Sequence, residues 1–211
     1  MKEKIQKIKG YYFITDSSLT RRGIFEDVKL ALSCGVSVFQ YREKNKSSFQ
    51  MHTEAVKLKK LCRNVLFLIN DRIDIALSSG ADGVHLGQDD MPLKIARKIL
   101  KKKIIGVTVH NVKEAIEAEK NGADYLGLSP IFQTSTKKDA GKPCGVEMIK
   151  KVKGSVRIPV VAIGGITPEN APQVVDAGAD ALCAISAVLC AEEPRNAIKR
   201  LQQIFEKKKN P

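Results

Sequence analysis

Residues 104–128 have the pattern of a complete strand–helix–strand unit: Ile104-Ile-Gly-Val-Thr-Val-His-Asn-Val-Lys-Glu-Ala-Ile-Glu-Ala-Glu-Lys-Asn-Gly-Ala-Asp-Tyr-Leu-Gly-Leu128. Ile104–Thr108 and Asp124–Leu128 are mostly apolar on consecutive residues, which is typical of parallel strands buried on both faces. Between them, the apolar residues of Val112–Lys120 lean to one side, as in an amphipathic helix, and Asn111 stands where an N-cap belongs. The stretch therefore predicts two parallel strands joined by a helix.

The same unit recurs along the chain. Eight apolar, β-rich runs are present: Tyr11–Thr15, Val36–Gln40, Val65–Asn70, Gly83–Leu86, Ile104–Thr108, Asp124–Leu128, Pro159–Ile163 and Ala181–Ile185. A Gly-Ala-Asp triplet precedes three of them, at residues 80–82, 122–124 and 178–180, and glycine suits the left-handed position that ends a helix. This repetition predicts an α/β protein with a single (β/α)8 barrel domain over residues 1–211. An open doubly wound sheet is the alternative, although no G-x-G-x-x-G follows the first strand.

Composition and charge narrow the function classes. The chain has 211 residues, 43% of them apolar and 28% charged, which is ordinary for a globular protein. A net charge of +13 favours anionic partners, either nucleic acid or phosphorylated metabolites. The lysines are spread along the chain, aromatic residues make up 5%, and no nucleic-acid motif is present. We therefore expect small phosphorylated substrates and no nucleic acid. A homo-oligomer is a further possible partner, and the sequence does not give the oligomeric state.

Location and redox state can also be predicted. No apolar run approaches the ~18 residues of a membrane helix, so we expect no membrane partner. The start Met1-Lys2-Glu3-Lys4 is not followed by an apolar signal region, which predicts a cytoplasmic protein. The five cysteines form no C-x-x-C pair, which favours reduced thiols over a disulfide frame or a zinc site.

Polar residues follow the predicted strands at the carboxyl ends, where the active site of a (β/α)8 barrel lies. Asp71 and Asp90 follow adjacent strands, which lie only ~4.8 Å apart. Together with Arg42 and Lys44 they suit Mg²⁺ bound to a diphosphate, because magnesium takes one or two carboxylates plus phosphate oxygens. The alternatives are that Asp71 caps a helix starting at Arg72, that Asp89-Asp90 cap the helix after Met91-Pro92 in the same way, and that the two cations are solvated loop charges.

A second anion site is expected at the last strands. The amides of Gly164-Gly165 can approach a phosphate, a helix starting at Pro168 adds its positive end, and Ile185-Ser186 completes the pocket. The loop residues Thr134-Ser135-Thr136-Lys137 add hydroxyls and a cation. The alternatives are close packing for the glycines and a flexible polar loop for the rest. Two anion sites indicate an enzyme that joins two phosphorylated substrates.

Several motifs in order carry a family resemblance. They are Gln40-x-Arg42-x-Lys44, Asn70-Asp71, Gly83-Val84-His85-Leu86-Gly87-Gln88-x-Asp90, Ser129-Pro130-Ile131-Phe132-x-Thr134-x-Thr136-Lys137, Ile163-Gly164-Gly165-Ile166 and Ala184-Ile185-Ser186. From about Tyr11 to Phe205 the chain resembles the thiamine phosphate synthase family, also called thiamine-phosphate pyrophosphorylases. The resemblance implies a Mg²⁺-dependent transferase that joins a pyrimidine methyl diphosphate to a thiazole phosphate and releases pyrophosphate by a dissociative mechanism.

The resemblance also implies residue roles. The pyrimidine diphosphate would be bound by Gln40, Tyr41, Arg42, Glu43, Lys44 and Asn70, and Mg²⁺ by Asp71 and Asp90. Thr108 and Lys137 would contact the diphosphate, so that Arg42, Lys44, Thr108 and Lys137 form the catalytic set. The thiazole would contact Thr134, Ser135 and Thr136, and its phosphate would be bound by Gly165, Ile185 and Ser186. Thr108 stands where serine is usual, Ser129 replaces a common glycine, and Gln133 replaces a common proline.

Two rival functions remain. A thiazole tautomerase resembles this family on the same barrel, but it needs a proton-transfer histidine in the loop after the sixth strand, and no histidine follows His110 in this sequence. A basic nucleic-acid-binding protein is the more remote rival. Of the other histidines, His85 lies within a predicted strand and is expected to be a hydrogen-bonded barrel residue rather than a ligand.

Overall fold

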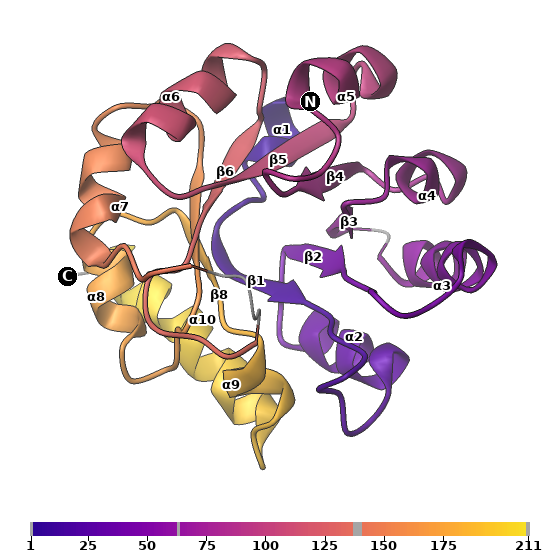
Figure 1. Cartoon of the computed structure of the whole chain (residues 1–211). Coiled ribbons are helices and arrows are strands. Elements are labelled where there is room, and N and C mark those ends of the chain that lie inside the picture. Colours follow the sequence, from indigo (N-terminus) through magenta and orange to yellow (C-terminus); the bar gives the residue numbers. More distant parts are fainter. Residues whose placement is uncertain (1, 63, 137–140, 210–211) are drawn as a thin grey trace.

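The strands form one closed parallel barrel in a computed structural model, which describes residues 2–62, 64–136 and 141–209. Each strand pairs with the next along the chain, and the last pairs with the first (Figure 1). The strands are β1 (Gly10–Ile14), β2 (Val38–Tyr41), β3 (Leu66–Asn70), β4 (Gly83–Leu86), β5 (Ile104–Val109), β6 (Tyr125–Leu128), β7 (Val160–Ile163) and β8 (Ala181–Cys183). The predicted (β/α)8 barrel is confirmed, and the open doubly wound sheet is wrong.

The helices that follow β1 form an outer ring around the strands (Figure 1). They are α2 (Ile24–Ser33), α3 (Ser48–Leu61), α4 (Ile73–Ser78), α5 (Leu93–Leu100), α6 (Val112–Lys120), α7 (Val146–Lys153), α8 (Ala171–Asp176), α9 (Ser186–Leu189) and α10 (Pro194–Lys209). The short α1 (Lys2–Ile5) precedes β1 and lies behind the strands, where Ile5 packs against the side chains of the barrel interior. The predicted helix at residues 112–120 is confirmed, with the Asn111 side chain accepting the Glu114 amide at 3.0 Å. In the described part of the chain, none of the helices combines the length and apolar character that a membrane crossing requires.

Two layers of apolar side chains explain why the strands are apolar on consecutive residues. One layer fills the barrel interior and includes Val38, Leu66 and Leu68. The other lies between the strands and the helices, where the rings of Phe39 and Phe67 stack with centroids 5.2 Å apart. Because both faces of each strand are buried, neither face could be polar without a partner.

The Gly-Ala-Asp repeat anchors strands as well as ending helices. Gly122 has φ of 91°, as expected for a glycine that ends a helix. The Asp124 carboxylate accepts the Ile105 amide at 2.8 Å, and the Asp124 amide donates to the Ile105 carbonyl at 2.8 Å. Arg97 adds an ion pair to Asp124 at 2.6 Å. The same two-way link joins Asp82 to Phe67 and Asp180 to Val160.

The helix after β7 begins later than the sequence indicates. A turn occupies residues 168–170, and α8 begins at Ala171 instead of Pro168. The Asn170 side chain accepts the Thr167 amide at 2.9 Å, and the Thr167 hydroxyl accepts the Glu169 amide at 3.2 Å. These reciprocal bonds are typical of a helix N-terminus, and the Ala171 amide donates to the Thr167 carbonyl at 2.9 Å as in a helix. Pro172 has no amide hydrogen to continue this pattern, so the regular helix begins three residues later than the expected start at Pro168.

Candidate active site

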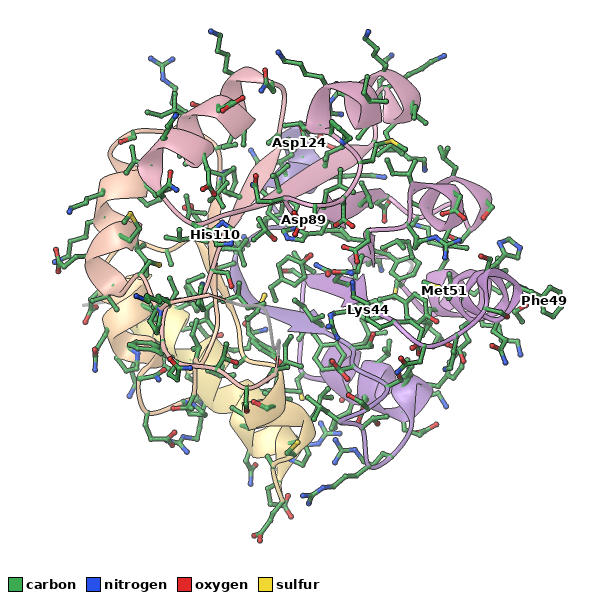
Figure 2. All side chains as sticks on the ribbon, in the orientation of Figure 1. Lys44, Phe49, Met51, Asp89, His110 and Asp124 are labelled. Atoms are coloured by element: carbon green, nitrogen blue, oxygen red, sulfur yellow. The ribbon has the colours of Figure 1, made fainter. Side chains whose placement is uncertain are left out.

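A pocket opens at the carboxyl ends of the strands, where the barrel fold places active sites. Figure 2 shows Lys44, Asp89 and His110 around the middle of the ring of strands, whereas Phe49 lies at its outer edge. Most of the residues that the sequence indicated line this pocket: Gln40, Arg42, Lys44, Asn70, Asp71, Asp90, Thr108, Thr134, Thr136, Gly165, Ile185 and Ser186. The fold therefore brings both expected anion sites to one cavity.

Three expected residues do not line the pocket. The Tyr41 hydroxyl donates to Glu54 at 2.6 Å on the outer side of β2, because side chains alternate along a strand. The Glu43 carboxylate is buried and accepts the amides of Lys44 and Asn45 at 2.8 and 2.9 Å. Ser135 is exposed and lies outside the lining. The side chains of Tyr41 and Glu43 thus shape the loop that follows β2, and Lys137 lies outside the described residues.

The Glu43 carboxylate holds that loop together by accepting hydrogen bonds from several of its neighbours. Burial by itself would raise its pKa, but hydrogen bonds from the Asn45 amide, the Ser17 hydroxyl and the Lys44 amide, with the nearby Lys46 charge, lower the pKa overall. Glu43 therefore stays ionised. It holds the chain so that Arg42 and Lys44, on either side of it, face the pocket.

The acidic end of the pocket is formed by Asp71 and Asp90, which follow β3 and β4. Asp71 has φ of 58°, a left-handed conformation that costs free energy for a residue with a side chain. Its carboxylate accepts a hydrogen bond from Lys44. Helix α4 begins after Arg72, and no side chain caps it. Asp71 is therefore not the helix cap that the simpler interpretation required, and its carboxylate faces the pocket instead.

Asp90 shares this acidic end. Its Oδ2 atom accepts the Gly87 amide at 2.6 Å, and α5 has Pro92 at its N-cap position without a side-chain cap. Burial raises the pKa of Asp90, and the neighbouring carboxylate of Asp71 raises it further. Two ionised carboxylates this close repel each other at a partly buried site, so a bound cation would stabilise their charged forms.

Mg²⁺ fits this pair of carboxylates. Within residues 2–62, 64–136 and 141–209, no cluster of three or more His, Cys, Asp or Glu side chains could cage a metal. Magnesium does not need such a cage, because it is often held by one or two carboxylates and completes its shell with water and substrate phosphate oxygens. Asp71 and Asp90 with Lys44 beside them supply that partial set.

The cationic side chain of Arg42 is held by an acid that the sequence analysis did not single out. Its guanidinium donates to the carboxylate of Asp16, which is 5% exposed. The Thr15 hydroxyl also accepts the Arg42 amide at 2.9 Å. Thr15-Asp16 comes directly after β1, so the rule applied to the other strand ends would have found it.

The glycines after β7 pack closely against the loop after β6. Gly165 has φ of +63°, and a Cβ atom there would lie 2.3 Å from the Gln133 carbonyl oxygen. At Gly164 a Cβ atom would lie 2.7 Å from Pro130. The Phe132 amide donates to the Gly164 carbonyl at 3.0 Å. Close packing is therefore one reason for these glycines, and Gly165 also lines the pocket beside Ser186.

The two histidines in the pocket have assigned partners. His85 lies between Tyr125 and Thr108, with ring nitrogens 2.9 and 3.0 Å from their hydroxyl oxygens, as expected for a hydrogen-bonded barrel residue. At the rim, Nδ1 of His110 lies 2.9 Å from the Glu114 carboxylate.

Known proteins with this sequence pattern share one description. The pattern of the family described as thiamine monophosphate synthase matches residues 11–188. A thiamine-phosphate synthase of Methanosarcina mazei is 52% identical over 207 residues, which cover 97% of this chain and 86% of that protein. A thiamine-phosphate synthase of Chloroflexus aurantiacus is 45% identical over 196 residues, covering 92% of this chain and 91% of that protein.

Solved structures with a similar fold include one from the same family. Thiamine phosphate pyrophosphorylase from Pyrococcus furiosus has a TM-score of 0.89 and 43% identity, covering 96% of this chain and 98% of that one. A 3-hexulose-6-phosphate synthase has a TM-score of 0.74 at 18% identity, covering 92% of this chain and 99% of that one, and shows the barrel fold alone. Since the family pattern spans most of the sequence and the relatives match nearly its whole length, the chain belongs to the thiamine monophosphate synthase family.

Proposed function

We propose that this chain joins 4-amino-2-methyl-5-(diphosphooxymethyl)pyrimidine to thiazole phosphate, releasing pyrophosphate and forming thiamine phosphate. The observation that carries the proposal is the two-ended pocket. Asp71, Asp90, Arg42 and Lys44 gather at one end, and Gly165 and Ser186 belong to the same cavity. A metal diphosphate suits the first end and a monophosphate the second.

The first step is loss of the diphosphate from the pyrimidine methylene. The carbon–oxygen bond breaks with its electron pair going to pyrophosphate, and the aminopyrimidine ring delocalises the positive charge that remains on the methylene. Arg42 and Lys44, which line the pocket, would stabilise the departing negative charge, and we include Lys137 in that role from its place in the family motif. Mg²⁺ held by Asp71 and Asp90 would neutralise further charge on the diphosphate.

The second step joins the two rings. The thiazole nitrogen donates its electron pair to the methylene, so that no side-chain nucleophile is needed. Holding both partners in one pocket makes this step effectively intramolecular. We assign the pyrimidine to Gln40 and Asn70, the thiazole to Thr134 and Thr136, and its phosphate to Gly165, Ile185 and Ser186. Thr108 would contact the diphosphate.

The rival functions give different results. A thiazole tautomerase would isomerise its substrate without releasing pyrophosphate. A nucleic-acid-binding protein would retain DNA or RNA near 0.15 M salt, with a steep dependence of affinity on salt. Cytoplasmic location and a homo-oligomeric state stay predictions.

The direct test uses the purified protein with both substrates and Mg²⁺. We expect thiamine phosphate and pyrophosphate to appear in equal amounts, and neither to appear when one substrate or the metal is omitted. Absence of product from folded protein with the metal supplied would overturn the proposal.

A further inference from the structure

Five side chains form a hydrogen-bonded row across the floor of the pocket. Nε2 of Gln40 donates to the Tyr12 hydroxyl at 2.8 Å, and the hydroxyl oxygens of Tyr12 and Tyr125 are 2.9 Å apart. The Tyr125 hydroxyl lies 2.9 Å from Nδ1 of His85, and Nε2 of His85 lies 3.0 Å from Oγ1 of Thr108. We call the row Gln40–Tyr12–Tyr125–His85–Thr108 the floor relay.

The relay joins two parts of the pocket through the barrel interior. Its middle members come from β1, β6 and β4, and the side chains of Tyr12 and Tyr125 are fully buried. Burial raises the pKa of both phenols above the ordinary tyrosine value, so each keeps its single proton. Its ends, Gln40 and Thr108, both line the pocket.

The donor and acceptor atoms along the relay give it a direction. An amide nitrogen only donates, so the Tyr12 oxygen accepts from Gln40. The Tyr12 proton then belongs to the Tyr125 oxygen, because the opposite choice leaves a buried hydroxyl proton without an acceptor. By the same reasoning the Tyr125 proton goes to Nδ1 of His85. A neutral imidazole with an accepting Nδ1 carries its proton on Nε2, and that proton goes to Thr108.

This direction sets what the two ends offer to a ligand. Thr108 accepts from His85, so its own hydroxyl proton is left to point at an acceptor in the pocket. At the other end Gln40 uses its nitrogen on Tyr12. Among the described residues its Oε1 atom has no hydrogen-bond partner, and it is not sealed from the pocket. A hydroxyl donor suits oxygens of a departing diphosphate, and a carbonyl acceptor suits an amino group on a pyrimidine ring.

We propose that the floor relay fixes Thr108 as a donor and Gln40 as an acceptor, with Tyr12, Tyr125 and His85 as positioning residues. The inference rests on the proposed function for the identity of the ligand, but the direction of the relay is a property of the free protein. The reverse direction would present an amide donor to the amino group and a hydroxyl acceptor to the diphosphate, and both contacts would be repulsive.

The first test reads the His85 tautomer by ¹⁵N NMR of the free, histidine-labelled protein at a pH where the imidazole is neutral. The chain has three histidines, so a His52→Asn, His110→Asn double variant leaves His85 as the single signal. We expect the proton on Nε2 and none on Nδ1. A proton on Nδ1 would overturn the proposed direction. This measurement needs no substrate, so it is independent of whether the proposed reaction occurs.

The second test cuts the relay at two places. Tyr125→Phe removes the donor to His85, so we expect a mixed His85 tautomer and a kcat about tenfold lower. Tyr12→Phe frees the Gln40 amide, so we expect KM for the pyrimidine diphosphate to rise about tenfold. If either variant unfolds, the wild-type tautomer and the other variant still decide.

The matched control is Tyr11→Phe. Tyr11 is equally buried and also spends its hydroxyl on one hydrogen bond, to the Ala184 carbonyl at 3.2 Å, outside the relay. We expect it to lower thermal stability while leaving the His85 tautomer, kcat and KM unchanged. If Tyr125→Phe and Tyr11→Phe behave alike in all three readouts, the relay has only a structural role and the inference is wrong. A wild-type protein without activity but with the expected tautomer would instead count against the proposed function alone.

Discussion

The guanidinium of Arg42 is paired with the buried carboxylate of Asp16, across the ends of the neighbouring strands β2 and β1. The two oxygens of Asp16 have separate tasks. Oδ2 faces Arg42, while Oδ1 accepts the Ser18 amide at 3.0 Å and shapes the loop after β1. The position of the Arg42 cation in the pocket is therefore set by an acid that is itself fixed by its own loop.

Asp16→Asn should separate these tasks. The asparagine oxygen can keep the Ser18 hydrogen bonds, but the amide nitrogen opposes the Arg42 guanidinium, since both are donors. We expect kcat/KM for the pyrimidine diphosphate to fall about tenfold or more, with little change in melting temperature. In an Arg42→Ala background the same substitution should have almost no further effect. Additive losses would show that Asp16 does not act through Arg42.

Asp71→Asn tests the metal role at nearly constant shape. Asparagine tolerates the left-handed backbone of residue 71 better than most residues, so the fold should survive. Loss of the charge should lower turnover about 100-fold or more at saturating Mg²⁺, while the melting temperature hardly moves. Asp89→Asn, a neighbouring pocket carboxylate, should cost far less. Equal effects from the two substitutions would count against a specific metal site.

Gly165→Ala should damage both stability and the phosphate end of the pocket. The new methyl would meet the Gln133 carbonyl at 2.3 Å on a backbone with positive φ. We expect destabilisation of about 1–3 kcal/mol and a higher KM for thiazole phosphate. Gly80→Ala is the control, because Gly80 has φ of +72° with nothing within 4 Å of the added atom. Thermal melts of both variants isolate the contact with the loop.

Asp82 should contribute stability that depends on pH. Burial opposes its ionisation, but hydrogen bonds from Lys4, Lys59 and the Phe67 amide outweigh burial and lower its pKa. A lowered folded-state pKa stabilises the protein above the unfolded-state value, and this stability is lost as pH falls through the folded-state value. Asp82→Asn should cost about 1–3 kcal/mol at pH 7. In urea melts the cost should shrink below about pH 4.

The exposed ion pair of Glu147 with Lys150 provides the comparison for Asp82. Because both side chains are mostly in water, Glu147→Gln should change the free energy of unfolding little at either pH. A cost at Asp82 that is independent of pH would contradict the charge-based explanation.

The dissociative chemistry predicts a large substituent effect on the pyrimidine. Replacing the ring methyl with trifluoromethyl withdraws electrons and destabilises the methylene cation, but leaves the diphosphate unchanged. The rate of the chemical step should fall by orders of magnitude while binding survives, each tenfold being ~1.4 kcal/mol of barrier. A near-normal rate, with chemistry rate-limiting, would favour direct displacement by the thiazole nitrogen.

The barrel fold and most of the pocket residues could be predicted from the sequence for one physical reason. Parallel strands are buried on both faces, so their ends stand out as the first polar residues, as at Asn70-Asp71. Alternation along β2 could also have separated Gln40 and Arg42, which face the pocket, from Tyr41, which does not. The same burial hides the floor relay, because an apolar run does not reveal that Tyr12 and Tyr125 face inward.

Other features depend on contacts between distant segments. The clash that requires glycine at 165 involves the carbonyl of Gln133, and the sequence does not show that these two segments touch. The late start of α8 is a local feature instead, because Pro172 has no amide hydrogen for the helical bond that would follow the one from Ala171 to Thr167.

A crystal structure with thiamine phosphate, pyrophosphate and Mn²⁺ in place of Mg²⁺ tests the two-ended pocket most directly, since Mn²⁺ can be located by its anomalous scattering. We predict Mn²⁺ between the carboxylates of Asp71 and Asp90, pyrophosphate beside Arg42 and Lys44, and the thiamine phosphate group at Gly165. Both anions at one end of the pocket, or a metal ion away from the two aspartates, would contradict the account.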